Sequence, residues 1–328
     1  MVASPDQRAR FLASGVDDDL PILDAHHHFF DLGRNYHPWL SDHTVAFRYG
    51  DYSAIKRDFM PADYRRAVAG HLVVGSVLME GEWDPRDPIG EMRWASEVAL
   101  EHDLPGAAIG QIWLDRADVG EVVAAYREMP LVRSVRHKPK AVARADHHPD
   151  FAAPGSMRDR AWRDGYALLA GAGLSFDLQT PWWHLGEAAE LARDFPETTI
   201  ILNHAGLPAD RSAEGLAGWR AALDRLAREP NVVAKISGIG VPGQDWTLAL
   251  QAPVIEGVIS AFGAERCAFA SNFPVDSLCA SFGTIFDVFK TAVRQRPVAE
   301  RLALFHDNAA RWYGLAEHVP QKWEPLLR

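Results

Sequence analysis

Residues 22–28 read ILDAHHH, a short and mostly apolar run that ends in three consecutive histidines. Apolar runs of this length are typical of strands buried on both faces, as in a parallel sheet. Similar runs rich in Val, Ile, Leu and Ala occur seven more times, at residues 73–80, 107–114, 132–138, 174–179, 199–204, 232–237 and 267–271. The pattern therefore predicts eight buried strands.

Longer stretches with an apolar stripe at helical spacing separate most of these runs, at residues 89–101, 119–128, 158–170, 185–195, 216–228, 253–262 and 282–294. Strands that alternate with helices form βα units and a parallel sheet. The chain shows no Gly-rich phosphate loop of the kind that doubly wound sheets carry. We therefore predict an α/β fold, a (β/α)8 TIM barrel over residues 21–328, preceded by an N-terminal tail of residues 1–20.

Two irregular segments interrupt the βα pattern. Residues 31–60, after the first strand, are rich in aromatic side chains, and we expect them to cover the mouth of the barrel. Residues 141–155, after the fourth strand, are predicted to form either a lid or a surface loop.

Charge and composition narrow the class of partner. The chain has 34 basic and 44 acidic residues, a net charge of -10, which argues against nucleic acid and against an anionic membrane surface. The spacing of Cys267 and Cys279 matches neither a zinc ribbon nor a redox pair, and residues 1–20 lack the features of a secretory signal. We predict a cytoplasmic protein that acts on a small molecule and uses no organic cofactor. The sequence does not decide whether the protein forms a homo-oligomer.

Histidines end two of the predicted strands. In a parallel barrel the reactive face lies at the carboxyl ends of the strands. His26 and His28 are two residues apart, so we expect them to share a face with each other and with Asp24, while His204 ends the sixth strand. Imidazoles that converge on a barrel mouth can hold a metal or a substrate carbonyl, and a hydrogen-bonded histidine cluster is the alternative.

Charged residues end two further strands. Arg136 and His137 end the fourth strand, where positive charge suits a carboxylate or a developing oxyanion. The alternative for Arg136 is an ion pair with a neighbouring acid. Glu80 closes the second strand, and because a buried carboxylate is costly unless it is paired or used, Glu80 is a candidate acid or base.

Tryptophans gather at the predicted strand ends. Trp113 lies at the end of the third predicted strand, and Trp182 and Trp183 follow the fifth strand, with His184 directly after them. A single Trp often fills a core, but several near the mouth favour a binding pocket with a flat or apolar wall.

Four segments together resemble the amidohydrolase superfamily: DAHHHFF at residues 24–30, NHAGLP at 203–208, SNFPV at 271–275 and DNAARWYGL at 307–315. The resemblance runs nearly end to end and is to the lactonase branch, which includes sugar lactonases and the pyrone dicarboxylate lactonase. It implies that His26, His28 and His204 are metal ligands and that Arg136 and His137 face the substrate.

The chain departs from this family at Asn272, where an aspartate normally serves as metal ligand and general base. A neutral amide cannot take a proton near neutral pH, so Asn272 cannot replace that base. Three neutral imidazoles also leave the charge of a divalent ion uncompensated. The sequence therefore does not decide whether zinc or manganese binds here. Asp276 becomes the first candidate base, with Glu80 and His184 behind it.

These observations predict a hydrolase that acts on a lactone or related ester in small-molecule catabolism. A metal-dependent decarboxylase of an aromatic acid is one alternative, although those enzymes usually show His-x-Gly-Glu after the sixth strand, where this chain has HAGL at residues 204–207. A non-catalytic homologue that binds ligand is the other alternative, and Asn272 is the observation behind it.

Overall fold

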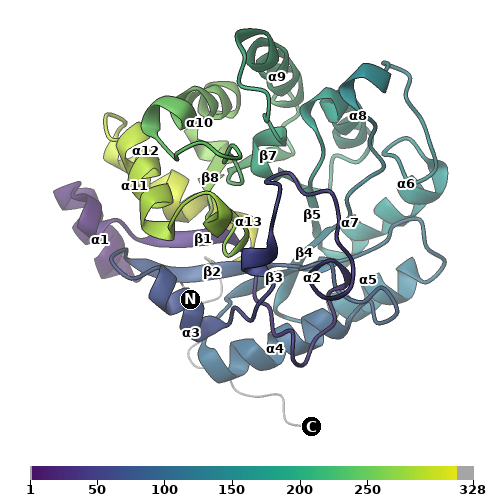
Figure 1. Ribbon diagram of the computed structural model, residues 1–328, viewed down its shortest axis with the longest axis horizontal. Coiled ribbons are helices and arrows are strands. Elements are labelled where there is room, and N and C mark those ends of the chain that lie inside the picture. Colours follow the sequence, from purple (N-terminus) through teal and green to yellow (C-terminus); the bar gives the residue numbers. More distant parts are fainter. Residues whose placement is uncertain (1, 316–328) are drawn as a thin grey trace.

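Eight parallel strands form one sheet whose order follows the sequence in the computed structural model, which describes residues 2–315 (Figure 1). The strands are β1 (Ile22–His27), β2 (Val73–Met79), β3 (Ala107–Gln111), β4 (Val132–Arg136), β5 (Ser175–Leu178), β6 (Ile200–Leu202), β7 (Val232–Ile236) and β8 (Cys267–Phe269). The sheet closes where the N–H of His28 donates to the carbonyl oxygen of Phe273 at 2.7 Å. The predicted (β/α)8 barrel is confirmed.

Helices surround the strands, as the ribbon in Figure 1 shows. Those that follow β2 to β8 are α4 (Gly90–His102), α5 (Val119–Arg127), α6 (Arg160–Tyr166) with α7 (Leu168–Ala172), α8 (Leu185–Asp194), α9 (Ala213–Leu226), α10 (Leu248–Phe262) and α11 (Phe282–Ala292). Helix α10 begins five residues before the predicted start at Pro253, because Thr247 caps it by accepting a hydrogen bond from the N–H of Leu250.

The residues before β1 pack against the barrel. Helix α1 (Pro5–Ser14) buries Phe11 completely, and Arg8 donates to Asp307 with 2.6 Å between Nη2 and Oδ2. Asp307 is the last residue of the helical turn Ala303–Asp307, which joins α12 (Val298–Leu302) to α13 (Asn308–Trp312). The domain boundary at residue 21 stays a prediction.

A β-bulge in β1 overturns the expectation that Asp24 shares a face with His26 and His28. The pairing of β1 with β2 shifts register between Asp24 and His27. Such a shift changes which side of the sheet the following residues face. Asp24 accepts hydrogen bonds from Tyr64 on the helix α3 (Pro61–Ala67) at 2.9 Å, outside the barrel, whereas His26 lies against His204.

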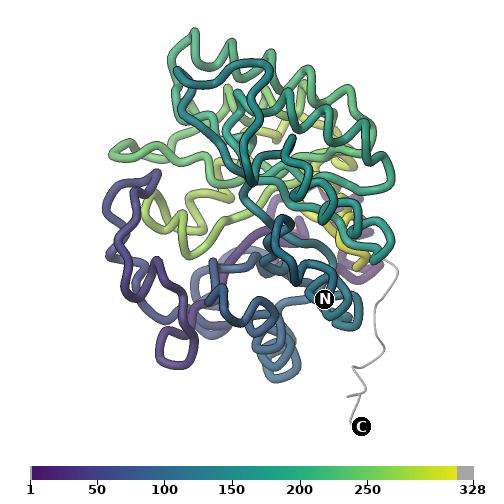
Figure 2. The backbone as a smooth tube through the Cα atoms, turned by 90° about the vertical axis from the view of Figure 1, so that its right-hand side faces the viewer, coloured from purple at the N-terminus to yellow at the C-terminus, as the bar shows by residue number. Residues whose placement is uncertain are grey.

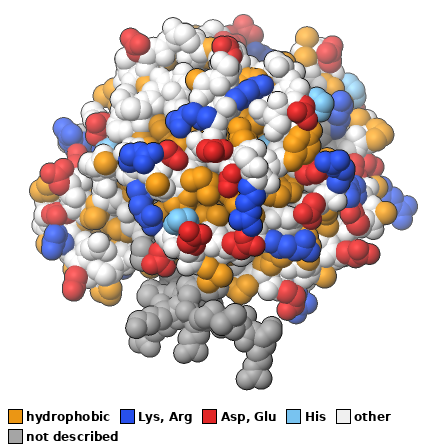
Figure 3. Space-filling model, turned by 60° about the horizontal axis from the view of Figure 1, so that its bottom comes forward, with side chains coloured by type: hydrophobic (Ala, Val, Ile, Leu, Met, Phe, Trp, Pro, Cys, Tyr) orange, Lys and Arg blue, Asp and Glu red, His pale blue; other side chains and the backbone are white. Residues whose placement is uncertain are grey.

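The loops at the carboxyl ends of the strands extend to one side of the molecule. Figure 2 shows the purple segment after β1 and the green loop after β7 on that side. As predicted, residues 31–60 reach over the barrel mouth, since Tyr49 Oη donates to Asp276 Oδ1 at 2.9 Å. Basic and acidic side chains are interspersed on the face shown in Figure 3. Among residues 2–315 no helix is long and apolar enough to cross a membrane.

An ion pair is buried inside the barrel. Lys235 Nζ on β7 donates to Asp177 Oδ1 on β5 at 2.7 Å, and both side chains are fully buried. Ser134 Oγ donates to the other carboxylate oxygen at 2.7 Å, and Tyr313 Oη lies 3.2 Å from each oxygen. The hydrogen bonds offset part of the cost of removing the two charges from water.

We expect Asp177→Ala to lower the free energy of unfolding by about 3–5 kcal/mol, because it leaves the Lys235 ammonium buried without its counter-charge. The double variant Asp177→Ala/Lys235→Met should be more stable than the single variant. Urea unfolding followed by tryptophan fluorescence measures both. An Asp177→Ala variant as stable as the exposed control Asp224→Ala would contradict this account.

Candidate active site

Three histidines meet at the carboxyl ends of β1 and β6. The ring centroid of His26 lies 5.2 Å from that of His28 and 4.7 Å from that of His204. His26 is fully buried, and neither of its ring nitrogens has a hydrogen-bond partner among the described residues. A buried imidazole without partners is costly, so this position is arranged for something other than stability.

Hydrogen bonds and burial fix the state of these rings. His28 Nδ1 lies 3.0 Å from the carbonyl oxygen of Met79, which can only accept, so Nδ1 carries the hydrogen and Nε2 keeps a free lone pair. His204 Nδ1 lies 3.0 Å from Ser237 Oγ. Burial holds the pKa of all three histidines well below the usual value, and Arg136 lowers these pKa values further. The rings are therefore neutral near pH 7.

The backbone is strained at two turns of the site. His204 has φ 55° and Ala205 has φ 52°, while Asn272 after β8 has φ 56°. Side chains other than glycine enter this left-handed region at a cost, and such residues concentrate at functional sites. The barrel imposes this conformation at both strand ends, which sets the directions of His204 and Asn272.

Neutral imidazole nitrogens are suitable ligands for zinc and similar ions, so the chemistry of the three histidines fits a metal. The surroundings leave the charge of such an ion uncompensated. No carboxylate of the described chain completes the set, and Arg136 and Lys235 both add positive charge around His26. Among residues 2–315, potential ligand atoms from three side chains lie within 4.8 Å of one another at a different place, formed by His147, His184 and Glu187.

His184 belongs to that second cluster and lies away from the barrel mouth. Its Nδ1 is 3.0 Å from Glu187 Oε1, and its Nε2 accepts a hydrogen bond from the N–H of Val142 at 3.2 Å. His147 Nε2 is 3.0 Å from the same carboxylate oxygen. Because Nε2 of His184 accepts, Nδ1 must donate, which makes the cluster a hydrogen-bonded clasp between residues 141–155 and α8.

Asp276 is a buried carboxylate at this end of the barrel that lies next to the pocket residues Arg48 and Tyr49 and keeps one oxygen free. Its Oδ1 accepts hydrogen bonds from Asn272 Nδ2 at 2.6 Å and from Tyr49 Oη at 2.9 Å, and Arg48 Nη2 lies 3.8 Å away. Its Oδ2 is buried and has no partner among the described residues. Burial raises the pKa of Asp276 to about 6, and Arg48 opposes the rise. Such a carboxylate suits a general base near neutral pH.

Arg136 and Glu80 form a buried ion pair between β4 and the end of β2. Arg136 Nε donates to Glu80 Oε1, and the N–H of Glu82 donates to Glu80 Oε2 at 2.6 Å. Arg136 Nη1 also donates to Gln179 Oε1 at 3.0 Å. Both oxygens of Glu80 are engaged, so this carboxylate orients Arg136 and is poorly placed to act as a base.

The structure places two predicted substrate-binding residues elsewhere. His137 follows Arg136 on the strand and so points to the opposite side, where its ring lies 6.0 Å from that of Trp162 on α6 and its Nδ1 accepts from the N–H of Leu114. The guanidinium carbon of Arg116 lies over the ring of Trp113, 4.9 Å from the ring centroid. Trp113 is not among the residues that line the pocket beside Trp182.

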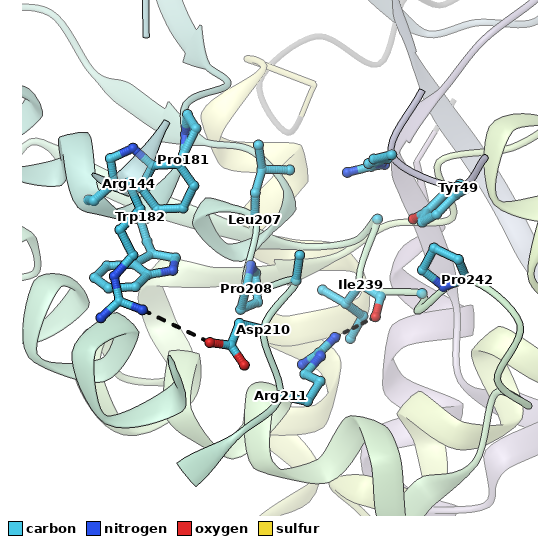
Figure 4. Close-up of a pocket in the computed structure, with 15 residues that line it drawn as sticks. Tyr49, Arg144, Pro181, Trp182, Leu207, Pro208, Asp210, Arg211, Ile239 and Pro242 are labelled. Carbon is cyan, nitrogen blue, oxygen red and sulfur yellow. Dashed lines mark hydrogen bonds and ion pairs between the residues drawn. The ribbon is translucent and has the colours of Figure 1, made fainter. Parts of the chain in front are cut away.

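A pocket of about 440 Å³ lies between the loops after β5, β6 and β7 (Figure 4). Trp182 and Trp183 line it, together with Arg48, Arg144 and Arg211. Its link to the reaction centre is Gly238, where an added Cβ would lie 2.4 Å from His204 Nδ1 and 2.7 Å from Arg48 Nη2. Gly238 therefore packs between the pocket and His204, which is not itself among the lining residues.

Sequence reasoning missed four side chains here: Arg48, Tyr49, Arg144 and Arg211. Arg48 and Tyr49 lie in the segment expected to cover the mouth, but an irregular loop has no period that shows which side chains point inward. Arg211 follows His204 by seven residues, so its place in the loop after β6 was a usable signal.

Comparison with known proteins agrees with this geometry. The amidohydrolase family model matches residues 23–315. The uncharacterised protein y4mH of Sinorhizobium fredii is 39% identical over 300 residues, which cover 90% of this chain and 99% of that protein. An L-fucono-1,5-lactonase of Burkholderia multivorans is 27% identical over 307 residues, which cover 90% of this chain and 96% of the relative.

A solved structure extends the likeness to three dimensions. The crystal structure of an amidohydrolase from Burkholderia multivorans with bound zinc is 26% identical, has a TM-score of 0.73, and is matched over 89% of this chain and 99% of its own. These likenesses confirm the predicted superfamily and lactonase branch, and they confirm an enzyme over a non-catalytic binding protein. The chain belongs to the amidohydrolase family and is a hydrolase of its lactonase-like type.

Proposed function

We propose that the enzyme hydrolyses a lactone or related cyclic ester in small-molecule catabolism. The observation that carries the proposal is the free oxygen of Asp276, a carboxylate of raised pKa that lies behind Arg48 and Tyr49 at the pocket. The L-fucono-1,5-lactonase relative supports the reaction class.

In the proposed reaction, water attacks the carbonyl carbon while Asp276 Oδ2 takes its proton. Asn272 and Tyr49 hold Oδ1, which fixes the orientation of the carboxylate before substrate arrives. The carbonyl oxygen becomes negative in the tetrahedral intermediate, and Arg48, which lines the pocket, is the group that stabilises it. The proton on Asp276 then passes to the leaving alkoxide, which opens the ring.

A divalent ion is the second element of the proposal. His26, His28 and His204 would hold zinc or manganese, which when bound would polarise the carbonyl. The zinc in the related amidohydrolase supports this assignment. Asn272 contributes no charge to such a site, and its amide instead donates to Asp276.

We expect Asp276→Asn to lower kcat for lactone hydrolysis by about 10²–10⁴-fold, because the proton acceptor is lost. Proton release from a panel of sugar, aromatic and aliphatic lactones measures the effect. The exposed Asp224→Asn on α9 is the matched control, and retention of full activity by Asp276→Asn would remove the assignment.

The pH dependence should report the same group. A carboxyl with a pKa of about 6 is protonated, and inactive as a base, at lower pH, so kcat/KM should fall as the pH drops through about 6. The variant Tyr49→Phe removes a donor to the carboxylate, so it should move this acid limb upward. A profile that is flat from pH 5 to pH 8 would show that another group is the base.

We expect Asn272→Asp to raise zinc affinity by about tenfold or more, since a carboxylate compensates charge that three imidazoles leave in place. Metal content after dialysis against a graded chelator series measures this without reference to activity. The double variant Asn272→Asp/His26→Ala should lose the gain. Equal zinc retention by wild type and Asn272→Asp would show that residue 272 does not face the ion.

A further inference from the structure

From the lining of the pocket we infer the class of substrate: a lactone with an apolar, aryl- or alkyl-bearing body and one anionic group such as a carboxylate. A polyhydroxylated sugar lactone is disfavoured, although a relative acts on one. The inference rests on the proposed lactonase function.

The wall of the pocket is largely apolar. The side chains that form it come from the loops after β5, β6 and β7, and include Trp182, Trp183, Leu207, Pro208, Ile239 and Pro242 (Figure 4). Such a surface gains free energy from excluding water with an apolar ring or chain.

The polar side chains of the lining are mostly occupied. Tyr49 Oη donates to Asp276, and Trp183 Nε1 donates to the carbonyl oxygen of Val142 at 2.9 Å. Arg144 lies over the ring of Trp182, 4.7 Å from its centroid. Asp210 also lines the pocket, and its carboxylate is occupied by Arg144 at 3.9 Å and by the N–H of Ser212 at 2.9 Å. None of the described lining residues is Ser, Thr, Asn, Gln or His. The hydroxyls of a sugar would leave water without side-chain partners of the usual kind, which costs binding free energy.

One positive charge in the wall has no counter-charge. Arg211 Nη2 donates to the carbonyl oxygen of Ile239 at 2.5 Å, while its Nε and Nη1 are buried and lack partners among the described residues. Arg211 makes no ion pair with any residue from 2 to 315, unlike Arg144 at the rim. Burial accordingly lowers the pKa of Arg211 to about 10.

A second guanidinium, that of Arg48, adds positive charge to the wall of the pocket. Arg48 has a buried Nη1 without a partner in the described chain, and its nearest carboxylate oxygen, on Asp276, is 3.8 Å away. Two incompletely paired guanidinium groups around an apolar pocket favour a ligand that brings a negative charge, because an anion in the pocket would compensate their positive charge.

The test uses three lactones: 4-carboxyphenyl-δ-valerolactone, phenyl-δ-valerolactone and L-fucono-1,5-lactone. The first two differ only in the carboxylate, and the third carries hydroxyls in place of the aryl group. We expect kcat/KM to be highest for the carboxylated lactone, by about tenfold or more over the phenyl compound, and lowest for the sugar lactone. If the sugar lactone is the best substrate, the inference is wrong while the proposed lactonase function stands.

Variants of Arg211 locate the anion subsite. Arg211→Met should abolish the preference for the carboxylated lactone, Arg211→Lys should keep part of it, and the exposed control Arg228→Met should leave it unchanged. A preference that survives in a folded Arg211→Met protein would overturn the role of this residue.

A binding measurement separates the inference from the proposed function. If none of the lactones is hydrolysed, the proposed function fails, and calorimetric titration with 3-phenylpropionate and 3-phenylpropanamide still tests the pocket. Tighter binding of the propionate, lost in Arg211→Met, supports an apolar anionic ligand. Equal binding of the two compounds, or binding of neither, contradicts it.

Discussion

The closure of the barrel between β1 and the segment after β8 is the interaction on which the rest of the site depends. Asp24 Oδ1 accepts from the N–H of Ser271 at 2.8 Å, and its Oδ2 accepts from Ser271 Oγ at 2.6 Å. The N–H of Asn272 donates to the carbonyl oxygen of His26 at 2.8 Å. These bonds join the first strand to the last and set the separation between the histidine cluster and the carboxylate of Asp276.

The local pattern of the sequence was sufficient to predict the fold and the clustering of the histidines. Each strand is a short apolar run, and the residues that end these runs must meet at one end of a parallel barrel. The direction of single side chains was harder to predict. The bulge in β1 separates Asp24 from His26, and His137, directly after the end of β4, packs near Trp162 instead of beside Arg136.

Contacts made by irregular segments lay beyond sequence reasoning. Nothing in residues 31–60 shows that Arg48 and Tyr49, rather than another aromatic or basic residue, reach Asp276. The same holds for His184, which follows two pocket tryptophans yet turns away to Glu187. Such placements depend on tertiary packing and not on a repeating pattern.

The left-handed backbone at residue 272 has an evolutionary consequence. Only a few residue types adopt such a conformation readily, and after glycine these are asparagine and aspartate. An exchange between the two therefore leaves the turn after β8 intact while it adds or removes a negative charge beside the histidines. One substitution at this position can therefore change the charge at the centre of the site without a change in the backbone of the barrel. Residue 272 is thus a position at which the charge of the site can evolve while the fold is conserved.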